Sequence, residues 1–364
     1  MTAAAPLSLP LDYPVYCSAG VLAEIGSIAE SVAPAHRFAI ISDETVAPLY
    51  AAAVAGQFPQ GTTQLFTIPA GEREKTRERW IELTDTLSAW GAGRDTTVIA
   101  LGGGVIGDLA GFVAATFMRG IPVVQVPTTL LAMVDASVGG KTAVDTPFGK
   151  NLVGAFHNPA AVVMDPSVLA TLPQEQLRAG VAEMIKHGVI ADAAYFDAVR
   201  HALPAITQHG AAAPDFPALI AGSVRIKAHV VAEDTREGGL RQILNFGHTI
   251  AHAIERELDF TIAHGEAVAI GMVVESRIAE AIGLATPGLH LAVADAVHAA
   301  GLPAAVPSGI STDALIASTR GDKKNRAGSV RYALPRGVGE METAEGRWSL
   351  PVTDEVVASV ISQL

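Results

Sequence analysis

The chain has 364 residues, of which 49% are hydrophobic and 17% charged, and its formal net charge is −12. This composition is typical of a folded globular protein, and the length favours two domains over one. The negative charge argues against nucleic acid as a partner, because binding to a phosphate backbone needs a basic face. A small anionic substrate stays compatible with it, since a few basic residues in a cleft set the local potential. The single cysteine, Cys17, excludes an intramolecular disulfide and a cysteine-based metal site.

The N-terminal residues do not show a basic stretch followed by an apolar run, so we expect no signal peptide. The most apolar part of the chain is interrupted by Asp108, Arg119, Pro122 and Pro127. These interruptions predict that no segment spans a membrane. We therefore expect a soluble cytoplasmic protein with no membrane partner.

In the first half of the chain, short β-branched runs alternate with helical patterns such as Val21–Ser31 and Thr76–Trp90. This alternation predicts crossover connections and a Rossmann-like, mainly parallel sheet. The predicted strands are Tyr13–Ser18, Arg37–Ser42, Gln64–Ile68, Thr96–Leu101, Val123–Val126 and Ala161–Met164.

The strand at 96–101 runs into a glycine-rich turn at 102–108, after which we expect a helix from Leu109. Glycines at such a turn let backbone amides approach a phosphate group, and the following helix N-terminus favours negative charge. Two features differ from an ordinary dinucleotide site: the strand is not the first of its sheet, and no acidic residue follows about twenty positions later. Asp43, at the end of an earlier strand, is the better candidate for a ribose contact. A tight turn without a ligand is the alternative interpretation.

Several basic residues lie beside Gly, Asn or His rather than in amphipathic surface patterns. Gly139-Gly140-Lys141-Thr142 resembles the end of a P-loop, but the upstream glycine of that motif is missing, which excludes an ATPase. Each lysine alone is typical of a solvated surface, whereas together they indicate convergence on an anion. The set is Lys141, Lys150, Lys186, Lys227, Arg241, Lys323 and Lys324.

After Pro173 the strand patterns stop and long alanine-rich amphipathic helices follow. We place the boundary near Leu177, with an α/β domain at 1–177 and an all-α domain at 178–364. The predicted helices include Gln174–Gly188, Phe216–Glu233, Gly247–Glu257 and Gly265–Ala281.

Three clusters in the helical half contain His or Glu: Glu183–His187, Asn245–His252 and His264–Glu266. A catalytic zinc ion takes three nitrogen or oxygen ligands from the protein and keeps one position open. His252 lies one helical turn after His248, so spacing alone would direct both side chains at a metal. The spacing leaves metal binding open, because helices also contain unrelated histidines at this distance.

Long motifs throughout the chain resemble the 3-dehydroquinate synthase family, in the order in which that family has them and over roughly Tyr13–Leu364. The resemblance implies NAD, one divalent metal ion (zinc or cobalt), and a sugar-acid phosphate substrate, 3-deoxy-D-arabino-heptulosonate 7-phosphate. The motifs are Gly102–Arg119, Pro127–Asp145, Lys150–Phe156, Glu183–Gly188, Leu244–Glu255, His264–Val268 and Asp322–Lys324.

The resemblance also implies roles for individual residues. Glu183, His248 and His264 would bind the metal, while His252 would face the substrate and help proton transfer. The family's acidic residue before Gly71 is replaced by Ala70 here, so the resemblance does not extend to that one nucleotide contact. NAD contacts would come from Asp43, Gly71, Glu72, Lys75, Gly103, Gly104, Val105, Ile106, Gly107, Asp108, Thr128, Thr129, Asp135, Lys141 and Lys150. The substrate site would comprise Arg119, Lys141, Asn151, Lys186, Lys227, Glu237, Arg241, Asn245, His252, Lys323 and Lys324, with one of the last two in contact.

The reaction implied is an oxidation by NAD, elimination of phosphate, reduction that regenerates NAD, ring opening and an aldol closure to 3-dehydroquinate. Arg119 matches a residue that family members supply across a dimer interface, which implies a homodimer. Three alternatives stay open: a related cyclase acting on a neutral sugar phosphate, a metal-dependent alcohol or glycerol dehydrogenase, and a protein that binds nucleotide only for regulation. The presence of Lys227, Arg241, Asn245 and His252 favours the acid substrate over the first.

Overall fold

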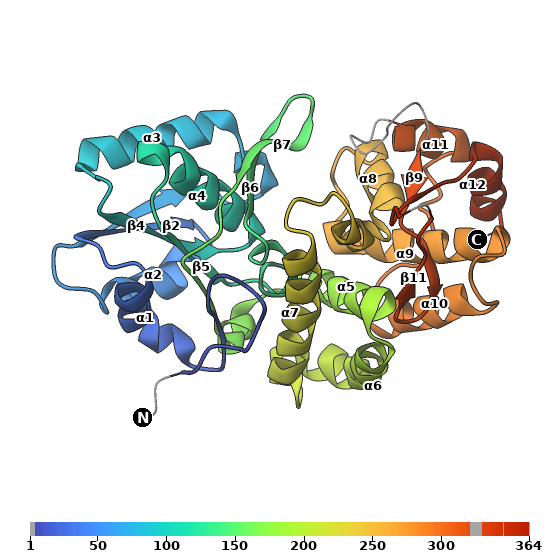
Figure 1. Ribbon diagram of the computed structural model, residues 1–364, viewed down its shortest axis with the longest axis horizontal. Helices are drawn as coiled ribbons and strands as arrows, with labels where there is room; N and C mark the ends of the chain where they lie inside the picture. The colour runs from blue at the N-terminus through green and yellow to red at the C-terminus, as the bar shows by residue number, and fades with distance from the viewer. Residues whose placement is uncertain (1–3, 321–329, 345, 364) are drawn as a thin grey trace. The chain divides into compact units, whose positions relative to one another are not determined.

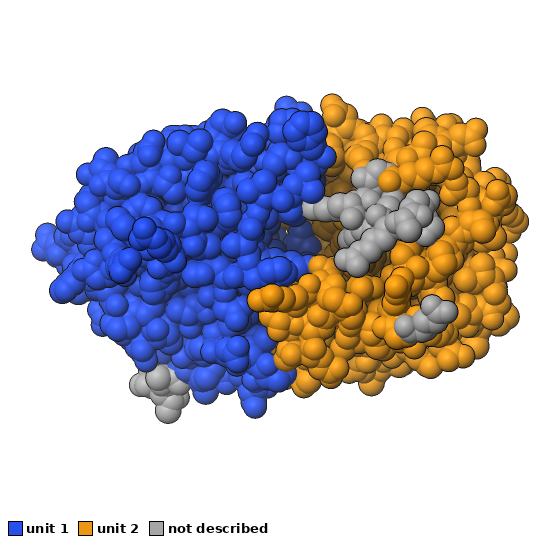
Figure 2. Space-filling view, turned by 45° about the horizontal axis from the view of Figure 1, so that its top comes forward, with its two compact units in different colours: residues 1–172 blue, residues 173–364 orange. Residues whose placement is uncertain are grey.

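The computed structural model describes residues 4–320, 330–344 and 346–363, and the chain divides into two compact units, Met1–Leu172 and Pro173–Leu364 (Figure 2). The boundary drawn from the sequence was at Leu177. That residue is buried inside α5 (Gln174–Ala191), the first helix of the second unit.

The first unit contains a six-stranded sheet in the order β1-β8-β5-β4-β2-β3, in which every pair of neighbours is parallel. The central strand β4 is buried along its whole length, as expected for a parallel strand covered on both faces. The predicted parallel sheet is therefore confirmed. Its strands are β1 (Val15–Cys17), β2 (Arg37–Asp43), β3 (Thr63–Ile68), β4 (Thr96–Gly102), β5 (Val123–Pro127) and β8 (Ala161–Met164).

Helices cover both faces of this sheet (Figure 1). On one face, α1 (Ile25–Val32) and α2 (Ala47–Ala55) contribute to one apolar core. On the other, α3 (Arg77–Trp90) and α4 (Gly104–Thr116) contribute to a second core. Short helical turns complete the unit: η1 (Val21–Glu24), η2 (Glu72–Glu74), η3 (Phe117–Arg119), η4 (Ala132–Ala136) and η5 (Pro166–Thr171).

Helix α4 begins at Gly104, five residues earlier than the predicted start at Leu109. Gly103 is the extended N-cap residue, and Gly107 already lies in the first turns of the helix. A Cβ atom on Gly107 would lie 2.8 Å from Oε1 of Gln125 on β5. The later glycine therefore permits close helix–sheet packing, which the sequence alone did not distinguish from a loop.

An antiparallel hairpin, β6 (Lys141–Thr146) and β7 (Gly149–Phe156), was not predicted. The hairpin packs on α4 at a glycine: a Cβ atom on Gly111 would lie 2.5 Å from Cγ2 of Thr142. Glycines within β7 weaken the strand pattern, and Gly154 is required there because a Cβ atom would lie 2.2 Å from the carbonyl oxygen of Thr142.

The second unit is helical, as predicted, and α7 has the predicted bounds. Two short antiparallel pairs, β10–β11 and β9–β12, were not predicted. No helix among the described residues is both long and apolar enough to cross a membrane. The elements of the second unit are α5, α6 (Ala193–His209), η6 (Gly210–Ala212), α7 (Phe216–Glu233), η7 (Leu240–Asn245), α8 (His248–Glu257), α9 (His264–Ala281), α10 (Leu289–Ala299), α11 (Thr312–Arg320), β9 (Arg331–Tyr332), β10 (Pro335–Gly337), β11 (Glu340–Met341), β12 (Leu350–Pro351) and α12 (Asp354–Ile361).

Candidate active site

The carboxyl edge of the parallel sheet has one point where the strand order reverses. From β2 the chain goes to β3 on one side, then returns to β4 on the other side of β2. Ligands of open α/β sheets bind in the crevice outside the carboxyl ends of the two strands at such a point. The residues that end these strands are Asp43 on β2 and Gly102 on β4.

The predicted nucleotide residues lie along this edge. Oδ1 of Asp43 accepts hydrogen bonds from the backbone N–H groups of Thr45 and Val46 at 2.8 and 2.9 Å, which fixes the carboxylate. The backbone N–H of Thr128, after β5, donates to the carbonyl of Gly102 at 2.9 Å. A Cβ atom on Gly103 would lie 3.0 Å from Cγ2 of Thr129, so the two turns touch. The helix N-terminus of α4 therefore opens on a compact edge that suits a phosphate group.

A cluster of charges surrounds the buried ammonium group of Lys75 in the first unit. Its Nζ lies 2.9 Å from Oε1 of Glu72, 3.3 Å from Oδ2 of Asp108 and 3.9 Å from Oδ1 of Asp145. Burial lowers the pKa of Lys75, but the three carboxylates outweigh it and raise the pKa. Burial also raises the pKa of Asp108 to about 6, against the opposing attraction of Lys75. Lys150 adds a second cation, with its Nζ 4.0 Å from Oε1 of Glu72.

Asp145 was not named as a site residue in the sequence analysis. Its Oδ1 accepts a hydrogen bond from the backbone N–H of Asn151 at 2.8 Å, and Asn151 has a positive φ of 53°. The backbone N–H of Asp145 donates to the carbonyl of Lys75 at 2.7 Å. Asp145 therefore connects the hairpin to Lys75. The sequence analysis missed Asp145 because it did not predict strand β6, in which this residue lies.

The other predicted residues of the first unit take these places. Gly71 precedes η2 with φ 115°, a conformation that favours glycine, and Asp135 lies in the π-helical turn η4. Lys141 is exposed at the start of β6, and Arg119 is exposed with a positive φ of 70°. Gly104, Val105 and Ile106 form the first turn of α4.

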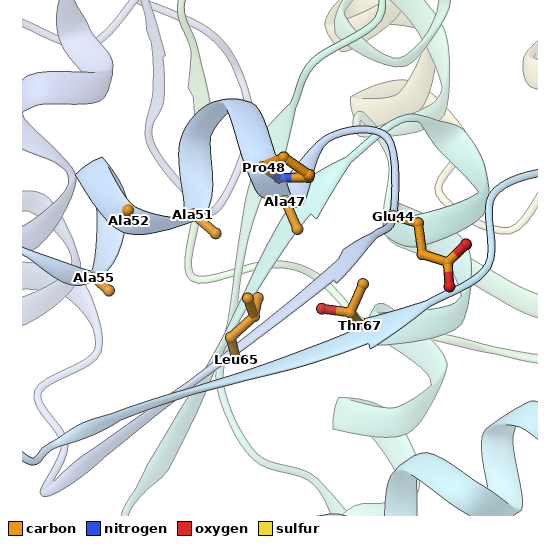
Figure 3. A pocket seen from close by; sticks show the side chains of 8 residues that line it. All are labelled: Glu44, Ala47, Pro48, Ala51, Ala52, Ala55, Leu65 and Thr67. Atoms are coloured by element: carbon orange, nitrogen blue, oxygen red, sulfur yellow. The ribbon is translucent and has the colours of Figure 1, made fainter.

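A separate apolar groove lies between α2 and β3 (Figure 3), lined by Ala47, Ala51, Leu65 and other small side chains. Glu44 is the one ionisable residue among its lining residues. None of the predicted site residues lines it, so we do not place the chemistry there.

In the second unit, helix α5 buries two opposite charges. Glu183 and Lys186 are 0% and 1% exposed, and Nζ of the lysine forms an ion pair with Oε2 of the glutamate. Two more cations, Lys227 on α7 and Arg241 on η7, are also buried. The elements α5, α7 and η7 pack against one another. Three cations on neighbouring elements make the local potential more positive, which favours an anionic ligand nearby.

Three ligand atoms converge on one point in this unit. Nε2 of His248 lies 3.7 Å from Oε1 of Glu183, and Nε2 of His264 lies 3.8 Å from the same oxygen. All three atoms lie within 4.8 Å of one another. They come from α8, α5 and α9, so the convergence depends on the packing of three helices.

The partners of the other ring nitrogens define what these imidazoles present. Nδ1 of His248 lies 3.1 Å from the carbonyl oxygen of Phe246, and Nδ1 of His264 lies 3.1 Å from Oε1 of Glu255. Since these oxygens accept, each Nδ1 donates, and in the neutral form of each ring Nε2 then presents an electron pair. Among the described residues, none donates a hydrogen bond to Oε1 of Glu183. Three electron-rich atoms at one point fit a divalent cation.

The converging set includes His264 on α9 and not His252, which the helical spacing would have chosen. The ring centroid of His252 lies 5.5 Å from that of His248 and 6.4 Å from that of His264. Glu255, which fixes His264, was not predicted. Its spacing is the signal that could have indicated it, because a residue three after His252 and seven after His248 lies on the same helical face.

A loop before η7 positions the remaining predicted residues. The carboxylate of Asp234 accepts hydrogen bonds from the backbone N–H groups of Gly238, Gly239 and Arg241 at 3.0, 2.7 and 3.0 Å. These bonds hold a loop in which the Arg241 Nη1 donates to the carbonyl of Thr235 at 2.7 Å. Asp234 was not predicted.

Asn245 lies at the end of η7 and is held by the same loop. Its Nδ2 donates to Oε1 of Glu237 at 2.9 Å, and Glu237 has a positive φ of 60°. A glutamate in this conformation is strained, which is common at functional sites. Lys323 and Lys324 lie outside the described residues.

Comparisons with known proteins match most of the chain. The family described as 3-dehydroquinate synthase N-terminal matches residues 65–179, and the family described as 3-dehydroquinate synthase C-terminal matches residues 180–325. The 3-dehydroquinate synthase of Symbiobacterium thermophilum is 46% identical over 337 residues, which cover 90% of this chain and 92% of the relative.

Two solved structures are similar over nearly their whole length. A 2-deoxy-scyllo-inosose synthase complexed with carbaglucose-6-phosphate, NAD+ and Co2+ has a TM-score of 0.87 at 27% identity, covering 96% of each chain. A 2-epi-5-epi-valiolone synthase from Streptomyces hygroscopicus with NAD+ and Zn2+ bound has a TM-score of 0.85 at 30% identity, covering 97% of this chain and 96% of the other.

The raised pKa of Asp108 predicts a pH-dependent stability that an Asp108→Asn variant lacks. Between about pH 4 and 6 the folded state holds a proton that the unfolded state has lost, so the free energy of unfolding falls as pH rises through this window. The fall attributable to this group is at most about 3 kcal/mol. Urea unfolding at pH 4, 5, 6 and 7 measures it as the difference between the two proteins. Parallel curves would contradict the shift.

Proposed function

The chain belongs to the 3-dehydroquinate synthase family, and on that premise we propose that it converts 3-deoxy-D-arabino-heptulosonate 7-phosphate into 3-dehydroquinate and phosphate. It is then a carbon–oxygen lyase of the shikimate pathway, which leads to chorismate and the aromatic amino acids. The observation that carries the proposal is the match of both family halves over residues 65–325, together with the converging Glu183, His248 and His264.

We propose that NAD binds in the first unit at the carboxyl edge of the sheet. The reversal of strand order between β2 and β4, the glycine turn and the fixed carboxylate of Asp43 support this assignment. The backbone N–H groups at the start of α4 would bind the pyrophosphate, and Asp43 would accept from a ribose hydroxyl. Lys75 and Asp108 would lie beside the cofactor with their charges balanced.

We propose that zinc or cobalt binds in the second unit to Oε1 of Glu183 and to Nε2 of His248 and His264. The hydrogen bonds of the two Nδ1 atoms to Phe246 and Glu255 support this assignment, because they leave both Nε2 atoms available as ligands. Three protein ligands leave a coordination position open for substrate oxygens. When bound, the metal supplies a Lewis acid and NAD supplies a reversible hydride acceptor.

The chain's own residues would bind and polarise the substrate. Buried Lys186, held by Oε2 of Glu183, would place a positive charge beside the substrate hydroxyls. Lys227 and Arg241 would bind anionic groups, because burial strengthens such charge-assisted contacts. His252, whose ring lies next to that of His248, would take up and return the hydroxyl proton.

Two alternatives differ in substrate or in outcome. The two similar solved structures are synthases that make other cyclic products, and one holds a neutral carbasugar phosphate. The higher identity to a 3-dehydroquinate synthase, 46%, favours the acid substrate. A dehydrogenase would release NADH, and its substrate would not need the buried cations around Lys186.

We also propose a cytoplasmic homodimer that meets at the hairpin β6–β7. The outer strand β7 exposes Leu152, Val153 and Phe156, and an exposed apolar strand is typical of a protein contact surface. Nε2 of His157, the residue after β7, lies 3.0 Å from the carbonyl oxygen of Ile121, two residues after the exposed Arg119. A second copy covering β7 would bring Arg119 to its neighbour's substrate.

The first experiment measures phosphate release from 3-deoxy-D-arabino-heptulosonate 7-phosphate, with absorbance at 340 nm followed in parallel. We expect phosphate in proportion to substrate without accumulation of NADH, and loss of activity after a chelator, restored by Zn2+ or Co2+. Steady NADH accumulation without phosphate would instead identify a dehydrogenase. Activity on a neutral sugar phosphate alone would identify the related cyclase.

Arg241→Ala should raise KM for the acid substrate by about 10- to 100-fold, the cost of one lost charge-assisted contact, with a smaller change in kcat. Arg225→Ala removes an exposed arginine from the neighbouring helix α7 and serves as the matched control. Steady-state kinetics of both variants make the comparison. An unchanged KM in Arg241→Ala would reject its contact with the substrate.

Arg119→Ala and His264→Ala test the dimer by complementation. Each variant alone should be inactive, whereas a heterodimer of the two has one complete site if Arg119 acts in its neighbour. Co-expression with two affinity tags isolates that heterodimer, which should show about half of the wild-type activity per dimer. A monomer in light scattering, or an inactive heterodimer, would refute the proposed interface.

A further inference from the structure

Helix α8, which carries His248 and His252, begins without a capping side chain of its own. Its N-cap residue is Gly247, in the left-handed conformation at φ 80°, and it makes no side-chain cap. The first N–H groups of a helix have no partner within the helix, and Ser, Thr, Asp or Asn usually supplies one at the N-cap. The partner here comes from another helix.

Glu275 on α9 supplies the cap. Its Oε2 accepts a hydrogen bond from the N–H of Gly247 at 2.7 Å, and its Oε1 accepts from the N–H groups of Thr249 and Ile250 at 3.1 and 3.2 Å. Glu275 is 0% exposed. A carboxylate at a helix N-terminus is stabilised by the helix dipole, and hydrogen bonds to an ionised acceptor are strong. The start of α8 is therefore attached to α9 through a buried charge.

Two glycines bring the backbones of the same helices into contact. A Cβ atom on Gly271 would lie 1.9 Å from the carbonyl oxygen of Gly247. A Cβ atom on Gly247 would lie 2.8 Å from Cγ and 3.0 Å from the backbone nitrogen of Met272. The close approach fixes the distance between the helices, and Glu275 fixes where α8 starts along α9.

This attachment joins two of the proposed metal ligands. His264 is the first residue of α9, and Glu275 lies about three turns further along the same helix. His248 is the first residue of α8 and lies between the amides that Glu275 binds. We infer that Glu275 is a positioning residue for the metal centre, which sets the imidazole of His248 relative to Glu183 and His264. The inference rests on the proposed function, because it assumes that these three residues bind the metal.

The test measures metal affinity and coordination in Glu275→Gln. The amide would turn an NH2 group towards backbone N–H donors and would remove the charge, so α8 should lose its fixed start. We expect the apoprotein to fold, as circular dichroism would show, and its affinity for Zn2+ to fall about 10- to 100-fold in competition with a chromophoric chelator. The visible absorption of the Co2+-loaded protein should change as well, because it reports ligand geometry.

Glu280→Gln is the matched control. Glu280 lies on the same helix and is partly buried, but its carboxylate binds His290 and Arg277. Its loss should lower thermal stability while the Zn2+ affinity and the Co2+ spectrum stay at their wild-type values. Glu275→Asp keeps the charge with a shorter reach, so its Zn2+ affinity should lie between those of the wild type and Glu275→Gln. If Glu275→Gln does not fold, Glu275→Asp is tested in its place.

Wild-type affinity and an unchanged Co2+ spectrum in Glu275→Gln, or in Glu275→Asp where that variant stands in, would overturn the inference. An equal loss of affinity in Glu280→Gln would overturn it too, since general destabilisation of α9 would then be the cause. Failure of the proposed function is seen separately, in the wild type: a protein that binds neither Zn2+ nor Co2+ would reject the metal centre itself, and the role of Glu275 with it.

Discussion

The buried carboxylate of Glu183 is the constraint on which the second unit depends. A fully buried charge is costly unless opposite charge or hydrogen-bond donors surround it, and Lys186 reaches one of its two oxygens. The other oxygen faces Nε2 of two imidazoles, whose Nδ1 atoms are hydrogen-bonded to the carbonyl of Phe246 and to Glu255. With neutral rings this arrangement is repulsive by itself, and a cation at the proposed metal site would make it favourable. The packing of helices α5, α8 and α9 therefore supports the proposed metal site.

In the first unit, the polar residues of the candidate site lie at the edge of an apolar sheet. Its sheet buries apolar residues on both faces, so polar groups gather where the strands end. Parallel strands end at one edge, which brings Asp43 and the glycine turn together although they are far apart in the sequence. Lys75 lies below this edge with carboxylates on several sides, and their mutual attraction keeps it charged despite burial. A polar edge on an apolar scaffold is what a dinucleotide with phosphates and sugars requires.

Periodicity and family motifs predicted the parallel sheet, the helical second half and the residues that converge in it, whereas contacts between distant segments stayed hidden. Strand β8 and helix α7 have the bounds that their apolar patterns predicted, because the apolar residues of these patterns are the ones that the fold buries. The predicted start of α4 was wrong, because a glycine that allows close packing of a helix cannot be told from a loop glycine in the sequence. The carboxylates of Asp145, Asp234 and Glu275 accept hydrogen bonds from backbone N–H groups outside their own helix or strand. No local sequence pattern indicates such a partner.

The buried cations of the second unit bear on substrate choice. Lys186, Lys227 and Arg241 are 1%, 5% and 2% exposed, and desolvation on this scale is retained in proteins mainly where function needs it. A substrate with both a carboxylate and a phosphate offers two anionic groups to this set, whereas a neutral sugar phosphate offers one. Losing one such contact inside a low-dielectric site costs more than the same loss at the surface, because water cannot replace the missing anion. If these residues bind the substrate as proposed, discrimination against neutral sugars would follow from burial of the cations rather than from their number, and the loop that Asp234 holds around Arg241 would maintain it.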